Sequence, residues 1–302
     1  MTSLTFSCFA PTLYRWRTQA LQQALEHGVD PVGVDWLLRE VAGVDRLQLR
    51  LLPQKADRPL VLHCSLDTLD RLWQQHLSDR TPLQYLAGFT HWRTFKLQVS
   101  PAVLIPRPET ELLIDWVEHW LRHHPHAPHH QGHWADLGTG SGAIALSLAT
   151  ALPQATLHAV DRSPAALALA RHNAQAYDLE TAIHWHLGSW LDPLTPWRGQ
   201  FAGLVSNPPY IPSAEIRQLQ PEVQHHEPHL ALDGGEDGLR DLQSLIDRSA
   251  EYLAPGGLLL LEMMAGQGEA VRSRLVQRGC YEQIEICQDL AGFDRFAVAF
   301  RR

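Results

Sequence analysis

From Trp134 to the C-terminus, short apolar runs typical of buried strands alternate with longer segments of helical periodicity. This alternation predicts strands near 134–138, 156–160, 182–187, 201–206, 257–262, 281–287 and 295–300. It predicts helices over 142–152, 164–176, 237–253 and 267–278. Strands that alternate with helices build a mostly parallel sheet with helices on both faces. The sequence therefore predicts an α/β fold with a mostly parallel, seven-stranded sheet.

The length of 302 residues suggests two domains, and the residues before this alternation have a different pattern. Residues 1–87 are predicted to form a small helical domain. One helix is expected to start near residue 11, and a second at Pro31, with Asp30 as its N-cap. Two more are expected to start at Ser65 and after Pro82. Residues 88–105 are predicted to form a two-stranded β connector, and 106–302 the α/β domain. The helical domain has no glycine-rich loop or catalytic cluster, so we expect it to dock a partner.

The composition disfavours several classes of protein. No apolar run approaches the roughly 18 residues needed to span a membrane, and no basic segment precedes the first apolar residues as it does in a signal peptide. Four scattered cysteines form no CxxC pair, which is typical of a reducing compartment, so we expect a cytoplasmic protein. The net charge of −8 favours a protein or small-molecule partner over nucleic acid, because nucleic-acid-binding surfaces are usually basic.

Residues 119–133 are rich in histidine, which raises the question of a metal site. Pro125, Pro128 and Gly132 interrupt any helix that could present these side chains in register, and the segment contains no acidic residue or cysteine. The sequence therefore favours a variable surface linker here, and it predicts no metal site.

A glycine-rich loop at residues 136–142 (DLGTGSG) follows the first strand of the α/β domain and opens an apolar helix. Its glycines allow a tight turn and a close approach of a ligand to the backbone. The spacing differs from the G-x-G-x-x-G of dinucleotide-binding folds, and an acid, Asp136, lies within the motif. Such an acid suits a cationic ligand headgroup, through water or backbone, better than a pyrophosphate.

Two further candidates follow the next strands. Asp161 ends the second strand about 20 residues after the glycines, where an acid accepts hydrogen bonds from both ribose hydroxyls of a nucleoside. Its alternative role is to cap the helix that begins at Pro164, although Ser163 fills that role better. Trp190 follows the third strand and could border the base of the same ligand; its alternative is a place in the core.

The fourth strand ends at residues 206–210 (SNPPY). Two consecutive prolines cannot continue a sheet ladder because neither has an N–H donor, so the chain turns out at Asn207 in a stiff loop. The Asn207 carboxamide oxygen and the Pro208 carbonyl could accept the two hydrogens of a planar NH2 group, with Tyr210 against its face. The alternative is a proline-rich turn with a packed tyrosine.

Together these motifs resemble class I S-adenosylmethionine-dependent methyltransferases, in which N-P-P-Y marks the subgroup that methylates planar NH2 nitrogens. More narrowly, the chain is similar to the HemK/PrmC family, which methylates N5 of the glutamine in the Gly-Gly-Gln motif of class 1 peptide chain release factors. The similarity spans nearly the whole chain through residues 82–88 (PLQYLAG), 104–111 (LIPRPETE), 227–239 (EPHLALDGGEDGL) and 289–295 (DLAGFDR). The chain departs from the family pattern at Ser189, His226 and Met264.

The resemblance implies a Rossmann-like class I methyltransferase fold that binds S-adenosylmethionine and releases S-adenosylhomocysteine. Asp161, Trp190 and Asn207 would contact the cofactor, together with the glycine-loop residues Gly138, Thr139, Gly140, Ser141 and Gly142. Asn207, Pro208, Pro209 and Tyr210 would form the glutamine pocket, with Asn207, Pro208 and Tyr210 as catalytic residues. We expect a monomer that binds release factors and neither a membrane nor nucleic acid.

An amide nitrogen is a poor nucleophile, and no loop residue is placed as a general base, so we expect catalysis by positioning and electrostatics. One alternative is adenine-N6 methylation of nucleic acid, which needs the same two acceptors and stacking ring. The net negative charge and the lack of an obvious nucleic-acid-binding domain count against it. Another is a cofactor-binding protein that regulates translation without catalysis, which the intact N-P-P-Y sequence disfavours.

Overall fold

The computed structural model describes residues 5–52, 59–124 and 128–302. The chain divides into two compact units. The first comprises Met1–Gly88 together with Pro221–His226, and the second comprises Phe89–Gln220 and Glu227–Arg302. Within the described ranges, no helix has the length and apolar character required to span a membrane.

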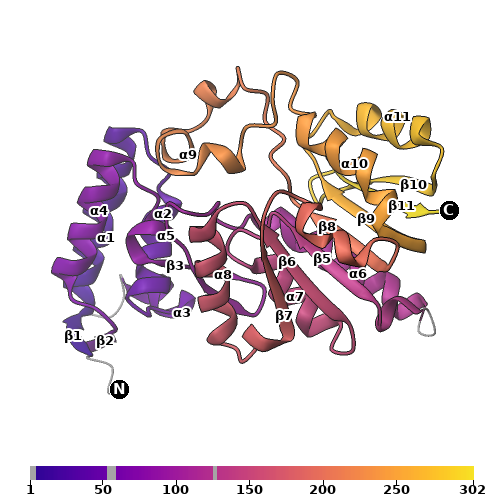
Figure 1. Ribbon diagram of the computed structural model, residues 1–302. Helices are drawn as coiled ribbons and strands as arrows, with labels where there is room; N and C mark the ends of the chain where they lie inside the picture. Colours follow the sequence, from indigo (N-terminus) through magenta and orange to yellow (C-terminus); the bar gives the residue numbers. More distant parts are fainter. Residues whose placement is uncertain (1–4, 53–58, 125–127) are drawn as a thin grey trace. The chain divides into compact units, whose positions relative to one another are not determined.

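The first unit is mainly helical (Figure 1). Its helices are α1 (Ala10–His27), α2 (Val32–Trp36), α3 (Arg46–Leu51), α4 (Leu66–Asp79), α5 (Leu83–Ala87) and α9 (Pro221–His226), with a π-helical turn at Leu37–Val41. The predicted start of α4 is confirmed, because the Ser65 hydroxyl accepts a hydrogen bond from the Thr68 N–H at 3.1 Å. Trp73 of α4 and Leu13 of α1 are fully buried in the apolar core of this unit.

One local expectation for the first unit is wrong, and two of its features were not predicted. Helix α2 begins at Val32 instead of Pro31, although Asp30 Oδ1 still accepts a hydrogen bond from the Val32 N–H at 2.9 Å. Strands β1 (Phe6–Phe9) and β2 (Pro59–Leu62) form an antiparallel pair that was not expected, and α3 is an additional helix. The strand pair joins segments far apart in the sequence, and α3 has only six residues, so neither produces a clear periodic signal.

The second unit is built on a seven-stranded sheet with the order β10-β11-β9-β8-β5-β6-β7 (Figure 1). Its strands are β5 (His133–Leu137), β6 (Thr156–Asp161), β7 (Ile183–Leu187), β8 (Phe201–Ser206), β9 (Leu253–Glu262), β10 (Tyr281–Gln288) and β11 (Asp294–Arg301). Strands β5 to β9 pair in parallel, whereas β11 is antiparallel to both β9 and β10. The predicted α/β class and the mostly parallel sheet are confirmed.

Helices cover both faces of this sheet, as predicted. They are α6 (Glu111–His123), α7 (Ala143–Ala151), α8 (Pro164–Gln175), α10 (Arg240–Tyr252) and α11 (Gly268–Arg278). In β9, Leu258 and Leu260 pack in the core that contains α6 and α7, while Leu259 and Leu261 pack in the core that contains α10 and α11. Successive strand residues point to opposite faces, so each layer of helices covers its own side of the sheet.

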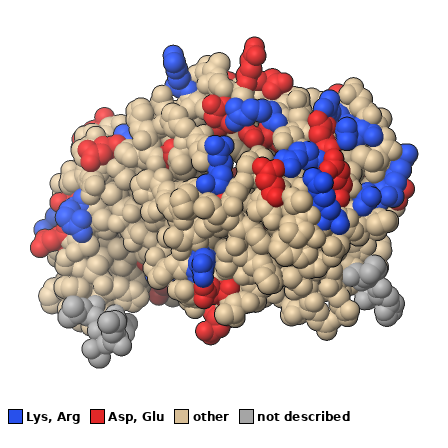
Figure 2. Space-filling model, in the orientation of Figure 1, with Lys and Arg blue, Asp and Glu red and all other residues tan. Residues whose placement is uncertain are grey.

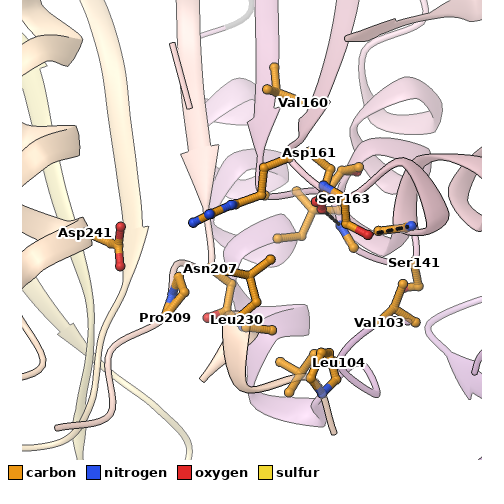
Figure 3. A pocket seen from close by; sticks show the side chains of 18 of the residues that line it. Val103, Leu104, Ser141, Val160, Asp161, Ser163, Asn207, Pro209, Leu230 and Asp241 are labelled. Carbon is orange, nitrogen blue, oxygen red and sulfur yellow. Dashed lines mark hydrogen bonds between the residues drawn. The ribbon is translucent and has the colours of Figure 1, made fainter. Parts of the chain in front are cut away.

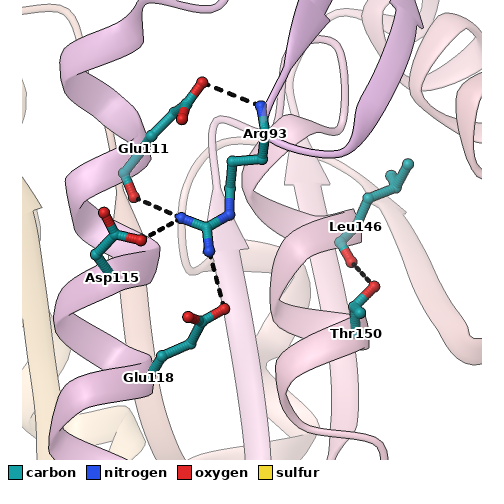
Figure 4. A network of polar contacts seen from close by, with 6 residues as sticks. All are labelled: Arg93, Glu111, Asp115, Glu118, Leu146 and Thr150. Carbon is teal, nitrogen blue, oxygen red and sulfur yellow. Dashed lines mark hydrogen bonds and ion pairs between the residues drawn. The ribbon is translucent and has the colours of Figure 1, made fainter.

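A two-stranded hairpin precedes α6, as the sequence predicts. It consists of β3 (Phe89–Trp92) and β4 (Phe95–Gln98). Arg93 lies in the turn of this hairpin and contacts α6 (Figure 4). Its guanidinium forms ion pairs with Asp115 and, at 2.9 Å, with Glu118. The same group donates a hydrogen bond to the Glu111 carbonyl oxygen at 3.3 Å. The Arg93 N–H also donates to Glu111 Oε1 at 3.0 Å. These contacts fix the hairpin against the first turns of α6.

The histidine-rich stretch is not simply a surface linker, which corrects the expectation from its composition. His129 Nε2 lies 2.7 Å from the Gly256 carbonyl oxygen, and the Trp134 indole N–H donates to the His129 carbonyl at 2.8 Å. His129 therefore anchors the chain to β9, while His126 lies outside the described residues. Among the residues that are described, no three His, Cys, Asp or Glu side chains are grouped so as to hold a metal ion.

Candidate active site

The strand order reverses at β5, with β6 and β7 on one side of it and β8 and β9 on the other. In open α/β sheets, ligands bind at such a switch point, beyond the carboxyl ends of the strands. A pocket with a cavity volume of about 170 Å³, open to solvent, lies at this place in the second unit (Figure 3). The predicted site residues that line it are Gly138, Thr139, Gly140, Ser141, Asp161, Trp190, Asn207 and Pro209. Gly142, Pro208 and Tyr210 are not among the lining residues.

The glycine loop takes a shape that side chains would hinder. Gly142 has a φ of 86° and forms the N-cap of α7, where an added Cβ would lie 2.9 Å from a Leu146 methyl group and 3.3 Å from the Ala170 backbone. Gly140, with a φ of 53°, has no atom within 4 Å of the place where a Cβ would stand, so its backbone is open to a ligand.

Asp136 holds this loop from beneath. Its Oδ2 accepts hydrogen bonds from the Thr139 hydroxyl at 2.6 Å and from the Ala145 N–H at 3.0 Å. The side chain is 1% exposed and does not line the cavity, so it acts on a ligand only through the loop backbone. Burial raises the pKa of Asp136 to about 7, against the opposing effect of the two hydrogen bonds.

A buried amide on α8 connects the loop to the hairpin. Asn173 Nδ2 donates to the Ser141 carbonyl at 2.9 Å and to the Gln98 carbonyl at 3.0 Å, and its Oδ1 accepts from the Gln98 N–H at 2.7 Å. All polar groups of this carboxamide are thus engaged, and β4 and the glycine loop hold one another in place.

Asp161 lies at the end of β6, directly beside the glycine loop. Its carboxylate accepts hydrogen bonds from the Gly140 N–H at 2.9 Å and from the Ser163 N–H at 2.8 Å. The Ser163 hydroxyl accepts from the Ala166 N–H at 3.2 Å and caps α8, as predicted. A carboxylate offers about four acceptor positions, so Asp161 keeps capacity for hydroxyl donors in the cavity.

Trp190 closes the cavity near the end of β7. Its backbone has a φ of 49°, and its ring lies so close to Gly138 that a Cβ there would be 3.2 Å from it. The indole N–H donates to Asp241 Oδ1 at 3.2 Å. In Figure 3, Asp241 lies on one side of the cavity and Asp161 on the other, with Asn207 and Pro209 between them.

The loop after β8 presents its residues in different directions. Asn207 faces the cavity, and its Nδ2 donates to the Thr110 hydroxyl oxygen at 3.1 Å. Pro209 lines the cavity, whereas Pro208 is buried. The Tyr210 hydroxyl donates to Glu262 Oε1 at 3.1 Å, and the Tyr210 carbonyl accepts from Gln267 Nε2 at 2.9 Å. Burial, with Glu262 beside it, raises the pKa of the Tyr210 phenol far above its ordinary value, so it stays neutral.

Several residues at the site carried no role in the sequence interpretation. Thr110 and Glu262 contact the loop after β8, and Arg107 pairs with the buried Glu227 at 2.8 Å. Thr110 and Arg107 belong to the stretch 104–111, and Glu227 to the stretch 227–239, both of which resemble the HemK/PrmC family. Pro106 and Pro228, one from each segment, line the cavity. Similarity to the family was therefore the feature of the sequence that could have placed these segments at the site.

The chemistry of the cavity fits a nucleoside. Asp161 offers acceptors for hydroxyls, the glycine loop leaves backbone exposed, and the Trp190 ring gives a flat apolar wall.

Comparison with known proteins agrees with this geometry. Residues 111–275 match the family model "Methyltransferase small domain". The release factor glutamine methyltransferase of Synechocystis sp. is 49% identical over 286 residues, covering 94% of this chain and 95% of that protein. The chain belongs to the release factor glutamine methyltransferase family. The Gloeobacter violaceus member is 46% identical, with 94% and 96% of the two chains covered, so the resemblance found from the motifs is confirmed.

One solved structure shares the fold of this family member, and a second is similar to it in sequence. The catalytic domain of hMettl16, in complex with the MAT2A 3'UTR hairpin 6, superposes with a TM-score of 0.54 at 15% identity, over 81% of this chain and 84% of that one. A release-factor-specific protein-(glutamine-N5) methyltransferase from Alicyclobacillus acidocaldarius is 26% identical over 68% of this chain and 99% of that one, with a TM-score of 0.40. The first of these supports the class I methyltransferase fold.

Proposed function

We propose that this protein transfers a methyl group from S-adenosylmethionine to N5 of the glutamine in the Gly-Gly-Gln motif of class 1 release factors. Its family membership supports the reaction, and the position of Asn207 at the cavity wall supports the site. The cofactor supplies the methyl group as an electrophile. Residues of the protein would bind the cofactor, hold the substrate amide and exclude water.

The loop after β8 would hold the substrate amide. Asn207 Oδ1 and the Pro208 carbonyl would accept its two hydrogens, which fixes the nitrogen and raises its electron density. The Tyr210 ring would lie against the amide plane and exclude water. Because the phenol stays neutral, Tyr210 acts as a wall and not as a base. The proton leaves after methyl transfer, when the nitrogen is far more acidic.

The glycine loop, Asp161 and Trp190 would bind the cofactor. Asp161 would accept the ribose hydroxyls, residues 138–142 would pass close to the amino-acid part, and Trp190 would border the adenine. These three groups follow β5, β6 and β7, so the ligand would lie along the carboxyl edge of the sheet, with its methyl group toward Asn207.

Adenine-N6 methylation is not favoured, although the related fold of hMettl16 was solved with RNA. On the face shown in Figure 2, acidic and basic side chains are mixed and do not gather into a basic patch. The net charge of −8 points the same way, because nucleic-acid binding depends on neutralising phosphates.

Mass spectrometry of a purified class 1 release factor, incubated with the protein and S-adenosylmethionine, tests the proposal. One methyl group is expected on the glutamine of the Gly-Gly-Gln peptide, with DNA and RNA present as competing acceptors and unmodified. Methylation of adenine with an unmodified release factor would overturn the assignment.

Asn207→Ala should lower turnover by about 100- to 1000-fold, because one preorganised group at the reacting atom is lost. Its affinity for S-adenosylhomocysteine, measured by calorimetry, should change much less. Gln218→Ala is the matched control, since it removes an exposed carboxamide beyond the same loop. Near-normal turnover of Asn207→Ala would remove Asn207 from the mechanism.

A further inference from the structure

Two buried polar side chains contact the loop that carries Asn207 and Tyr210, and one of them, Thr110, also lines the cavity. Thr110 ends the 3-10 turn before α6 and is 4% exposed, and Glu262 ends β9 and is 1% exposed. Thr110 accepts the Asn207 Nδ2 hydrogen bond at 3.1 Å, and Glu262 accepts the Tyr210 hydroxyl at 3.1 Å. The Thr110 hydroxyl also lowers the pKa of Glu262, and Glu262 Oε2 is buried without a hydrogen-bond partner of its own among the described residues.

We propose that Thr110 and Glu262 are positioning residues for methyl transfer, which set the orientation of the Asn207 carboxamide and of the Tyr210 ring. This inference rests on the proposed function of Asn207 and Tyr210. It goes beyond that function because the role it gives to Thr110 and to Glu262 is exercised through a residue of the loop: Asn207 for Thr110 and Tyr210 for Glu262.

The direction of the hydrogen bonds carries the argument. An ionised carboxylate only accepts, so the Tyr210 hydroxyl donates to Glu262 Oε1, and the buried Oε2, which has no other partner among the described residues, is the acceptor open to the Thr110 proton. Once its single proton is used in this way, Thr110 offers only lone pairs, and it can bind the Asn207 carboxamide only through the Nδ2 donor. A carboxamide held by its nitrogen keeps Oδ1 as its free acceptor. The acid on β9 thereby decides which end of the Asn207 side chain a substrate NH2 group meets.

Tyr210 is held by the same acid. A tyrosine ring at a loop can rotate about two side-chain torsions, and the bond to Glu262 Oε1 fixes its hydroxyl end. Gln267 fixes the backbone of the same residue by donating to its carbonyl at 2.9 Å. Both ends of Tyr210 are therefore tied to residues outside the loop, which holds the plane of the ring.

The pKa of Glu262 lies close to neutral pH, so the carboxyl group can gain or lose a proton there. Burial raises its pKa to about 7, while hydrogen bonds from Thr110 and Tyr210 and the charge of Arg295 oppose that rise and Glu109 adds to it. Arg107 is a further charged group facing this cluster through Tyr210. Below the pKa, Glu262 carries a proton and becomes a donor, so Thr110 can turn its own proton toward Asn207. Protonation thus removes the constraint on the carboxamide.

Substitutions at Thr110 separate positioning from packing. Thr110→Val keeps the shape of the side chain and removes the hydroxyl, whereas Thr110→Ser keeps the hydroxyl and removes a methyl group. We expect Thr110→Val to lower kcat on release factor by about 10- to 100-fold with little change in KM, and Thr110→Ser to restore most of the rate. Equal kcat in Thr110→Val and the parent protein, with both folded, would overturn the role of Thr110.

Glu262→Gln tests the charge. The parent protein should show a kcat that rises with pH through about 7 as Glu262 loses its proton. In Glu262→Gln this rise should be absent and kcat should be at least tenfold lower at pH 8, because the glutamine amide can donate where the carboxylate only accepts. A variant that keeps the parent's rate and pH profile would overturn the role of Glu262.

One measurement does not depend on the substrate. The side-chain NH2 signal of Asn207 in a ¹⁵N–¹H correlation spectrum is identified by its loss in Asn207→Ala. It should shift in Thr110→Val and in Glu262→Gln, and stay near its parent position in Thr110→Ser. An unmoved signal refutes the positioning even if release factor is methylated. Failure of the proposed function would appear separately, as an unmodified release factor with the parent protein.

Discussion

At the scale of single residues, Asp161 has an observed structural role and a proposed cofactor role, and both would use the same carboxylate oxygens. Its carboxylate accepts the Gly140 and Ser163 N–H groups, which shapes the glycine loop and the start of α8. The proposed cofactor role adds two ribose hydroxyls to the same group. A carboxylate can serve both because its oxygens together offer about four acceptor positions.

We expect Asp161→Ala to weaken binding of S-adenosylhomocysteine by tenfold or more. Charge-assisted hydrogen bonds of this kind contribute roughly 1.5–3 kcal/mol each. Calorimetric titration measures the loss, and Ser163→Ala is the comparison, because it weakens the start of α8 without removing the carboxylate. If both variants bound the ligand equally well, Asp161 would be a structural residue of the loop and nothing more.

The residues that sequence reasoning could find at this site are those that follow strand ends. Asn207 and Asp161 come directly after predicted strands and Trp190 comes three residues after one, so the topology of a parallel sheet brings them together. Thr110 and Glu262 could not be found in this way. Thr110 is 97 residues from Asn207, and Glu262 is 52 residues from Tyr210. Only the pairing of β9 with β8 and the packing of α6 on β9 bring these residues together.

At the scale of secondary-structure elements, three neighbouring strands carry a line of imidazoles on one face of the sheet. His133 Nδ1 of β5 lies 3.0 Å from His158 Nε2 of β6, and His158 Nδ1 lies 2.9 Å from His186 Nε2 of β7. The Trp197 ring covers His158, with a centroid distance of 4.7 Å. Three neutral imidazoles can satisfy this line, since each has one donor and one acceptor.

This line of histidines should make the second unit sensitive to acid. Burial, then the charges of His186, His133 and His184, lower the pKa of His158 to about 3, from 6.5 in an unfolded chain. Between pH 6.5 and pH 3, His158 binds a proton in the unfolded state but not in the folded state. The free energy of unfolding therefore falls as the pH falls from about 6.5 toward 3.

Thermal melts at pH 7.5 and pH 5.5 test this. Asp136 and Glu262, with pKa values raised to about 7, act in the opposite direction, so the informative quantity is a difference between variants. His158→Leu should lose less melting temperature on acidification than the parent does, whereas the exposed His172→Gln should behave like the parent. The same acid-induced loss in His158→Leu would assign the effect to other groups.

Element boundaries show where local sequence patterns stop being informative. The strands and helices of the second unit match their predicted ranges within a few residues, because each is long enough to show its period. Strand β1 has four residues, and its partner β2 lies beyond three helices, so only long-range pairing defines it. His129 looks like a linker residue by composition and is fixed by a carbonyl of β9, 127 residues away.

At the scale of the whole molecule, the two units are not consecutive pieces of the chain. Helix α9, between β8 and α10 in the sequence, belongs to the first unit. Arg80 Nε lies 3.3 Å from Glu222 Oε1, and His226 Nε2 lies 2.7 Å from the Asp79 carbonyl oxygen. His226, which departs from the family pattern, thus takes part in a contact between residues 147 apart that no local pattern predicts.

This arrangement changes how the docking role of the first unit must be tested. The hypothesis is that residues 1–87, with the connector that follows, bind the release factor away from its glutamine, because a Gly-Gly-Gln loop offers little surface for discrimination. A shortened chain that starts at Gly88 would also remove the partners of α9. Loss of activity in that chain could then come from a disturbed loop between β8 and α10 as well as from lost docking.

Two substrates separate these causes. The chain that starts at Gly88 should bind S-adenosylhomocysteine like the full protein, because every residue that lines the cavity lies in the second unit. On intact release factor its KM should rise at least tenfold, since remote binding energy is gone. A short Gly-Gly-Gln peptide cannot reach a distant surface, so the shortened chain should methylate it as well as the full protein does. A comparable loss of activity on the peptide would mean that the site is ordered only when α9 keeps its partners. Equal KM values on intact release factor, with both proteins folded, would refute docking by the first unit.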